Sequence, residues 1–314
     1  MRGLRDRMVN LTGKTAFLFA GQGSQYVGMG KGLYDAFPES KAIFDRADKA
    51  LGFSISGTCF NGKPEILKQT IFSQPAILTV SIASYEAFKA RVKVAPSFMA
   101  GLSLGEYSAL IAAGVFTFED GLKLVRKRAE IMDEAVRKYP GKMAAVLDLS
   151  FDKIKDICLK SGSEIANINA PGQVVISGKK EAVDKAKDLC LQAGAKRVIE
   201  LEVSGAFHSS LMFEASAELK QRLDDTIVCE PSVPAISNYT AGPQRSCVEI
   251  KENLIYQLYK PVRWEESMKF IISQGVSSFI EFGPGKVLRG LMRRIEPNAQ
   301  VISIEKKDDI LGLQ

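Results

Sequence analysis

The pentapeptide GLSLG at residues 101–105 constrains the fold of this chain more than any other stretch. The apolar run APSFMAG precedes it, and LGEYSALIAAG, rich in small residues, follows it. Glycines at both ends permit a sharp turn from a strand into a helix, with the Ser103 hydroxyl projecting at the edge of a sheet. We therefore expect a buried strand, a tight turn and a helix that ends at Gly114. In the alternative reading, Ser103 is only a helix cap beside a packing glycine.

The flanking sequence alternates apolar runs with helical patterns. TAFLFA (15–20) predicts a strand that enters the GQGSQ loop, and residues 31–52 follow with helical spacing. Residues 74–92 predict a buried helix with Pro75 near its first turn. Such alternation favours an α/β fold whose mostly parallel sheet is covered on both faces.

The pattern changes near residue 140. From KMAAVLDL to AKRVIELEV the order is strand, helix, strand, strand, helix, strand, which is the split-βαβ, ferredoxin-like pattern. We expect residues 139–205 to be an inserted subdomain within a core made of residues 12–138 and 206–306. A helix to about Asp225, the strand-like VPAISN, the strand VSSFIEF and the helix KVLRGLMRRI complete that core.

Composition excludes several classes of protein. The 314 residues are 46% hydrophobic and 25% charged, as in a globular domain, and no apolar run approaches the roughly 18 residues of a membrane helix. The N-terminal MRGLRDRMVN does not read as a secretory signal. The net charge of +6 is interleaved with acidic residues, which argues against nucleic-acid binding and fits an anionic ligand or an acidic partner. The five scattered cysteines form no C-x-x-C pair, so no metal site is expected.

A serine hydroxyl needs a base before it can act as a nucleophile. The chain has one histidine, His208, in SGAFHSSLM between a strand and a helix. It is either the base or an ordinary core or surface residue. An oxyanion would need two donors, for which the backbone N–H groups of Leu104 and Gln22 are candidates. The Gln22 loop could also be a plain turn, but it is no dinucleotide loop, because Tyr26 stands at the third glycine position.

Arg128 lies on or beside the apolar stripe of a helix that opens with a capping-box-like pair, Thr117 and Asp120. Val125 and Met132 are stripe residues on either side of it. The guanidinium either reaches water while its stem packs, the default reading, or meets a buried anion such as the carboxylate of an acyl substrate.

Taken together, several stretches of this sequence resemble those of the malonyl-CoA:acyl carrier protein transacylase family. Members of that family are acyltransferases of fatty acid synthesis. The resemblance runs from about residue 14 to residue 305. It rests on GQGSQ, QPA, GLSLGEYSAL, Arg128, NAPGQVVISG, GAFH and EFGPGKVLRGL. It implies an α/β-hydrolase-like core with a ferredoxin-like insertion.

The resemblance also implies the chemistry. Ser103 would attack the thioester of malonyl-CoA with His208 as base, Gln22 and Leu104 would hold the oxyanion, and Arg128 would bind the malonyl carboxylate. The thiol of acyl carrier protein would then take the malonyl group. The remaining family positions are Gln257, which orients the histidine, and the pocket residues Gln74, Met132 and Phe207.

Two departures from the family pattern are Leu102, where histidine is common, and Ala20, where proline is usual. Neither position supplies the base or the carboxylate-binding group. The resemblance implies no cofactor and no metal, and we expect a monomer in a bacterial cytoplasm, or else a processed plastid or mitochondrial form. Two other functions stay open: a serine hydrolase or thioesterase, and an inactive relative that only binds a carrier protein.

Overall fold

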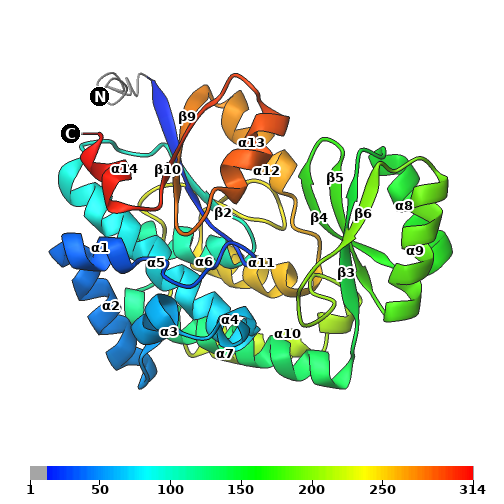
Figure 1. Cartoon of the computed structure of the whole chain (residues 1–314), viewed down its shortest axis with the longest axis horizontal. Helices are drawn as coiled ribbons and strands as arrows, with labels where there is room; N and C mark the ends of the chain where they lie inside the picture. The colour runs from blue at the N-terminus through cyan, green and yellow to red at the C-terminus, as the bar shows by residue number, and fades with distance from the viewer. Residues whose placement is uncertain (1–12, 314) are drawn as a thin grey trace.

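The computed structural model describes residues 13–313, so the N-terminal MRGLRDRMVN and residue 12 of the predicted core lie outside the described part (Figure 1). Two sheets organise the described residues, one of six strands and one of four. The larger has the order β10-β9-β1-β2-β7-β8, parallel from β10 to β7, with β8 antiparallel at the edge. Its strands are β1 (Lys14–Phe19), β2 (Phe98–Gly101), β7 (Ala235–Ile236), β8 (Pro243–Gln244), β9 (Val276–Phe282) and β10 (Gln300–Ile304).

Both faces of the larger sheet are buried, as the sequence predicts. Along β1, Phe17 and Phe19 enter one apolar cluster, whereas Ala16 and Leu18 enter another on the opposite face. Because successive strand residues point to opposite faces, a strand covered on both sides must be apolar throughout.

Helices supply both layers. The layer that meets Phe17 and Phe19 includes the long helix α5, and the opposite layer includes α12 and α13. The helices outside the small sheet are α1 (Lys31–Ala36), α2 (Pro38–Leu51), α3 (Ile55–Asn61), α4 (Pro64–Lys68), α5 (Thr70–Arg91), α6 (Leu104–Ala112), α7 (Phe118–Lys138), the 3-10 helix η1 (Ser210–Met212), α10 (Ala215–Asp224), α11 (Cys247–Tyr259), α12 (Trp264–Ser273), α13 (Val287–Ile295) and α14 (Lys307–Leu311).

The smaller sheet stands to one side of this body, in green in Figure 1. It is antiparallel, with the order β4-β5-β3-β6. Its elements are β3 (Lys142–Leu147), α8 (Phe151–Ser161), β4 (Glu164–Ala170), β5 (Gln173–Gly178), α9 (Lys180–Gln192) and β6 (Arg197–Glu200). The predicted succession of strands and helices in this segment is therefore confirmed. A separate apolar cluster, which includes Val146, Ile154 and Val183, packs the two helices against the sheet.

Three predicted elements differ from the structure. The helix predicted to open around Pro75 begins at Thr70, so this proline lies inside α5. Proline cannot donate to the carbonyl of Ile71, four residues earlier, and the Arg126 guanidinium donates to that oxygen instead, at 2.6 Å. A tertiary contact thus supplies the donor that the local sequence lacks.

The helical segment 31–52 is broken into α1 and α2. Phe37 is extended, with φ −128° and ψ 121°, because the following Pro38 disfavours helical backbone at the residue before it. The predicted strand VPAISN forms only the two residues of β7, because the chain turns back after Ser237, where Ala241 N bonds to Ser237 O, and then pairs with β7 as β8. By contrast, the predicted cap at Thr117 is confirmed: its hydroxyl accepts from Asp120 N at 3.1 Å. No helix within residues 13–313 is long and apolar enough to cross a membrane.

Candidate active site

Ser103 occupies the turn between β2 and α6, with φ 52° and ψ −101°. A side chain at Gly101 would place its Cβ 1.9 Å from the backbone of Gly105, and a Cβ at Gly105 would lie 2.1 Å from Phe19 O. Only glycine fits at either position, which explains the spacing on each side of the serine. The strained backbone at Ser103 is typical of functional sites and is maintained by the packing around it.

His208 lies beside this serine although 105 residues separate them. Its Nε2 is 2.8 Å from Ser103 Oγ, and its Nδ1 is 2.7 Å from the main-chain oxygen of Gln257. A carbonyl oxygen can only accept, so Nδ1 carries the proton and the neutral ring presents a lone pair at Nε2. The Ser103 hydroxyl therefore donates to Nε2, which is the arrangement that a general base requires.

The imidazole is held in its neutral form. His208 is 5% exposed, and burial, followed by the charge of Arg128, lowers its pKa from 6.5 to about 3. Its backbone has φ 55°, so both members of the pair adopt a conformation that is uncommon for residues other than glycine.

Arg128 projects from α7 into the same site and is 1% exposed, so the solvent-facing alternative is wrong. Its Nη2 donates to Ser103 Oγ and to Gln257 Oε1, each at 3.1 Å, and its Nη1 donates to Gln74 Oε1 at 2.7 Å. Within the described residues its Nε has no hydrogen-bond partner. All three acceptors are neutral, so this buried cation can still bind an anion.

Of the other predicted pocket residues, Gln74 contacts this guanidinium directly. Gln74 Nε2 lies 3.4 Å from Met132 Sδ and 3.5 Å from Gln22 Oε1, which joins α5, α7 and the loop after β1. Phe207 is 4% exposed and belongs to the same apolar cluster as Met132.

The candidate oxyanion donors lie at the same edge of the sheet. β1 and β2 are adjacent and parallel, with Phe19 opposite Gly101, so the Gln22 loop and Leu104 follow neighbouring strand ends. A Cβ at Gly21 would lie 2.5 Å from Leu102 O, which shows how closely this loop approaches the turn. Leu104 is the first residue of α6, and the N–H of a first helical residue is not used by the helix.

Sequence reasoning missed three buried polar residues next to the Ser103 turn: Glu106, Asn238 and Gln244. Asn238 Oδ1 accepts from Ser103 N at 2.6 Å, and Glu106 is fully buried. Burial raises the pKa of Glu106 to about 7, against the lowering effect of its hydrogen bonds and of Arg128. One sequence feature could have pointed to Glu106: it is the single acidic residue in the predicted buried helix GEYSALIAAG.

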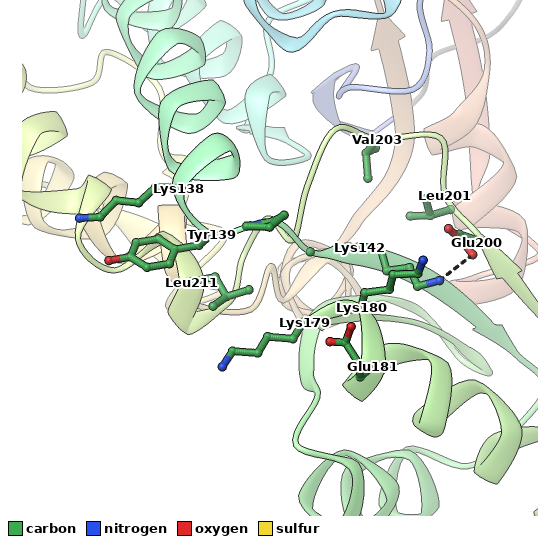
Figure 2. Close-up of a pocket in the computed structure, with 12 residues that line it drawn as sticks. Lys138, Tyr139, Lys142, Lys179, Lys180, Glu181, Glu200, Leu201, Val203 and Leu211 are labelled. Atoms are coloured by element: carbon green, nitrogen blue, oxygen red, sulfur yellow. Dashed lines mark hydrogen bonds and ion pairs between the residues drawn. The ribbon is translucent and has the colours of Figure 1, made fainter.

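A cavity of about 660 Å³ lies elsewhere, where the chain passes between the two sheets. Figure 2 shows its lining, including Lys142, which forms an ion pair with Glu200 at 3.2 Å. Leu201 and Val203 line this cavity, and the neighbouring Ser204 contacts Thr70 near Gln22. Among the described residues that line it, none belongs to the Ser103 site.

The arrangement can activate an alcohol and bind a small carboxylate. Ser103 Oγ meets a neutral imidazole on one side and a guanidinium on the other. Among the described residues no group of three or more histidine, cysteine or acidic side chains could hold a metal ion.

Comparisons with known proteins agree with one another. A family model described as "Acyl transferase domain" matches residues 16–305. The protein named "Malonyl CoA-acyl carrier protein transacylase" of Bacillus subtilis (strain 168) is 47% identical over 302 residues, which are 95% of this chain and 95% of that protein. A protein of the same name from Staphylococcus aureus (strain MSSA476) is 42% identical over 304 residues, covering 95% and 98%.

Solved structures match over a similar share of the chain at somewhat lower identity. The structure titled "PlMCAT:AntF (holo): type II PKS acyl-carrier protein in complex with its malonyl-transacylase" superposes with a TM-score of 0.93 at 38% identity, covering 96% of this chain and 99% of that chain. The crystal structure of an acyl carrier protein S-malonyltransferase from Vibrio cholerae has a TM-score of 0.93 at 39% identity, covering 96% and 100%.

Proposed function

Because this chain belongs to the acyl transferase domain family, we propose that it transfers a malonyl group from malonyl-CoA to the phosphopantetheine thiol of acyl carrier protein. The chain is an acyltransferase, and transfer would supply extender units for fatty acid synthesis. The observation that carries the malonyl assignment is the position of Arg128 Nη2, 3.1 Å from the Ser103 oxygen. In a malonyl thioester the carboxylate lies two carbon–carbon bonds from the carbonyl carbon, so a cation that binds it must stand beside the nucleophile.

In the first half-reaction, the proton of Ser103 Oγ passes to His208 Nε2 as the oxygen bonds to the thioester carbon. The N–H groups of Gln22 and Leu104 would hold the oxyanion of the tetrahedral intermediate. Its collapse breaks the carbon–sulfur bond, and the departing thiolate of CoA takes the proton from His208. A malonyl ester remains on Ser103.

In the second half-reaction, His208 takes the proton of the carrier thiol, and the sulfur attacks the ester carbon. The carbon–oxygen bond breaks, and Ser103 recovers its proton from His208. The substrate would assist both steps, because a malonyl carboxylate beside Arg128 offsets the positive charge that lowers the pKa of His208. An acetyl group lacks this carboxylate.

The pocket residues have matching roles in this proposal. Gln74 would hold the Arg128 guanidinium with its 2.7 Å contact, and the main chain of Gln257 would orient His208. Met132 and Phe207 would limit the room around the carbon that joins the carbonyl to the carboxylate, so unbranched malonyl is preferred over branched units.

We also propose the finer description of the fold, an α/β-hydrolase-like core of residues 12–138 and 206–306 with a ferredoxin-like subdomain of residues 139–205. The separate apolar cluster of the small sheet and its order β4-β5-β3-β6 support this division. The proposal needs no cofactor, since malonyl-CoA is a substrate. It places a monomer in a bacterial cytoplasm, in keeping with the bacterial relatives.

The test is the intact mass of the protein after mixing with malonyl-CoA. The wild type should gain one malonyl group, and Ser103→Ala should gain none. With both substrates, double-reciprocal plots should be parallel, and malonyl carrier protein should accumulate. Intersecting lines with no labelled serine would reject transfer, and release of free malonate in its place would indicate a hydrolase.

A further inference from the structure

Glu106 has no part in the proton transfers above, yet it lies directly below the reacting serine. It is three residues after Ser103, in the first turn of α6, and is 0% exposed. A buried carboxyl group costs free energy unless hydrogen bonds compensate for its lost hydration, so its contacts indicate what it does.

Its two oxygens accept three hydrogen bonds, two from the β7–β8 hairpin and one from α11. Oε2 accepts from Asn238 N at 3.1 Å and from Gln257 Nε2 at 2.7 Å, and Oε1 accepts from Gln244 Nε2 at 2.7 Å. Asn238 follows β7, Gln244 lies in β8 and Gln257 lies in α11. The carboxyl group on α6 therefore joins the β7–β8 hairpin and α11, both of which lie more than 130 residues away in the sequence.

Two of these donors lead to the reacting groups. Asn238 Oδ1 accepts from Ser103 N, and Gln257 Nε2 also donates to Ser103 O at 2.9 Å. The main-chain oxygen of Gln257 accepts from His208 Nδ1. Both the turn and the imidazole are thus held by residues that Glu106 holds in turn.

The contacts also determine which way the Gln257 amide faces. Its Oε1 accepts from Arg128 Nη2, and its Nε2 faces the oxygens of Glu106 and Ser103. A reversed amide would set N–H groups against the guanidinium and an oxygen against the carboxyl group. Gln257 therefore bridges a buried cation and a buried acid, and each end requires the observed orientation.

We propose that Glu106 is a positioning residue for acyl transfer, which holds Gln257 and Asn238 so that the Ser103 hydroxyl and the His208 imidazole stay aligned beside Arg128. The inference rests on the proposed function. It assigns Glu106 no contact with the substrate.

The first test is Glu106→Gln, which keeps the shape of the side chain. One oxygen of the new amide can still accept from Asn238 and Gln257, but its NH2 group then faces the donor Nε2 of Gln244. Because Gln244 Nε2 then loses its acceptor and the network shifts, we expect the rate of Ser103 acylation by malonyl-CoA to fall about 10- to 100-fold.

A second substitution in the same network provides a rescue. In the wild type, Asn253 Nδ2 donates to Gln244 Oε1 at 3.1 Å. In E106Q/Q244E, the glutamate at position 244 would keep this bond and would also accept from the amide at position 106. Every donor again meets an acceptor, and the buried acid is restored one residue away. We expect acylation to recover to within about threefold of the wild-type rate.

Glu281→Gln is the matched control. Glu281 is also buried, at 1% exposed, but its carboxyl group accepts from Leu288 N, Arg289 N and Ser303 Oγ. Its loss should lower thermal stability without changing acylation. Because His208 is the only histidine in the chain, its Nδ1–H resonance can be assigned without ambiguity in protein labelled with ¹⁵N-histidine. That resonance should shift in E106Q and stay in place in E281Q.

The outcomes separate this inference from the proposed function. If the wild type takes up no malonyl group, the proposed function fails. If the wild type is labelled and E106Q acylates as fast, or E281Q loses as much rate, only the positioning role fails. Recovery of stability without recovery of rate in E106Q/Q244E would also overturn it. Where E106Q does not fold, the acylation rate of the folded double variant E106Q/Q244E decides the matter.

Discussion

Replacing Arg128 by alanine is the most direct test of how the site selects its acyl group. The guanidinium is 1% exposed and stands 3.1 Å from Ser103 Oγ, and its three hydrogen-bond acceptors within residues 13–313 are neutral. A malonyl carboxylate bound there would be desolvated, and its cation would compensate for the lost hydration. In Arg128→Ala that carboxylate is buried without a partner, whereas an acetyl group loses no such contact.

The size of the effect follows from this burial. Removing one partner of a buried, hydrogen-bonded charge pair costs about 2 to 5 kcal/mol. Water can enter the space that the arginine leaves, so the lower part of the range applies, about 2 to 3 kcal/mol. We therefore expect the ratio of kcat/KM for malonyl-CoA to that for acetyl-CoA to fall about 30- to 150-fold.

The assay is the initial rate of Ser103 acylation, followed by intact mass with each thioester separately. Arg126→Ala is the matched control, because Arg126 lies on the same helix but contacts Ile71 O and Glu130. It should lose stability, since Ile71 O lacks a helical donor at Pro75, and keep the selectivity ratio. A ratio that is unchanged in folded Arg128→Ala, or that falls equally in Arg126→Ala, would refute the carboxylate-binding role.

Three further predictions concern the groups around the site. Since burial and Arg128 lower the pKa of His208 to about 3, NMR of this single histidine in the free enzyme should show a neutral ring down to pH 5; a titration near 6.5 would contradict this. The pKa of Glu106 is raised from 4.5 to about 7, so the folded state holds this proton more tightly than the unfolded chain does. The stabilisation that comes from this tighter proton binding is complete below pH 4.5 and is lost as the pH rises through 7. The unfolding free energy of the wild type, relative to that of Glu106→Gln, should thus fall by about 3 kcal/mol over that window in denaturant titrations, and a flat difference would exclude the shift. Gly105→Ala would place a Cβ 2.1 Å from Phe19 O, so we expect a loss of about 3 kcal/mol or more in the same titrations; a fully stable variant would show that the turn can relax.

Much of the local structure could be predicted from the sequence. The glycines at 101 and 105 specify the tight turn, because their missing side chains are needed for packing against neighbours in the chain and against β1. The Thr117 cap and the succession of elements in residues 139–205 were likewise predicted correctly. These features depend on interactions within a few residues or on the period of apolar residues, both of which are visible in one sequence.

Elements that depend on distant partners could not be predicted in this way. The start of α5 is one example: Pro75 is tolerated inside the helix because Arg126, from another helix, bonds to Ile71 O. The surroundings of Arg128 are another, since helical spacing alone left both a solvent-facing and a buried side chain open.

The sequence alone therefore determined the turn that carries Ser103, the single candidate base and the alternation that leads to a sheet covered on both faces. Only the tertiary structure decided that Ser103 and His208 lie 2.8 Å apart, that Arg128 is buried beside them and that Glu106 joins the segments around them. The physical reason is range. Backbone sterics and helix capping act between close neighbours in the chain, whereas side chains more than a hundred residues apart meet only when the adjacent parallel strands and their covering helices pack together.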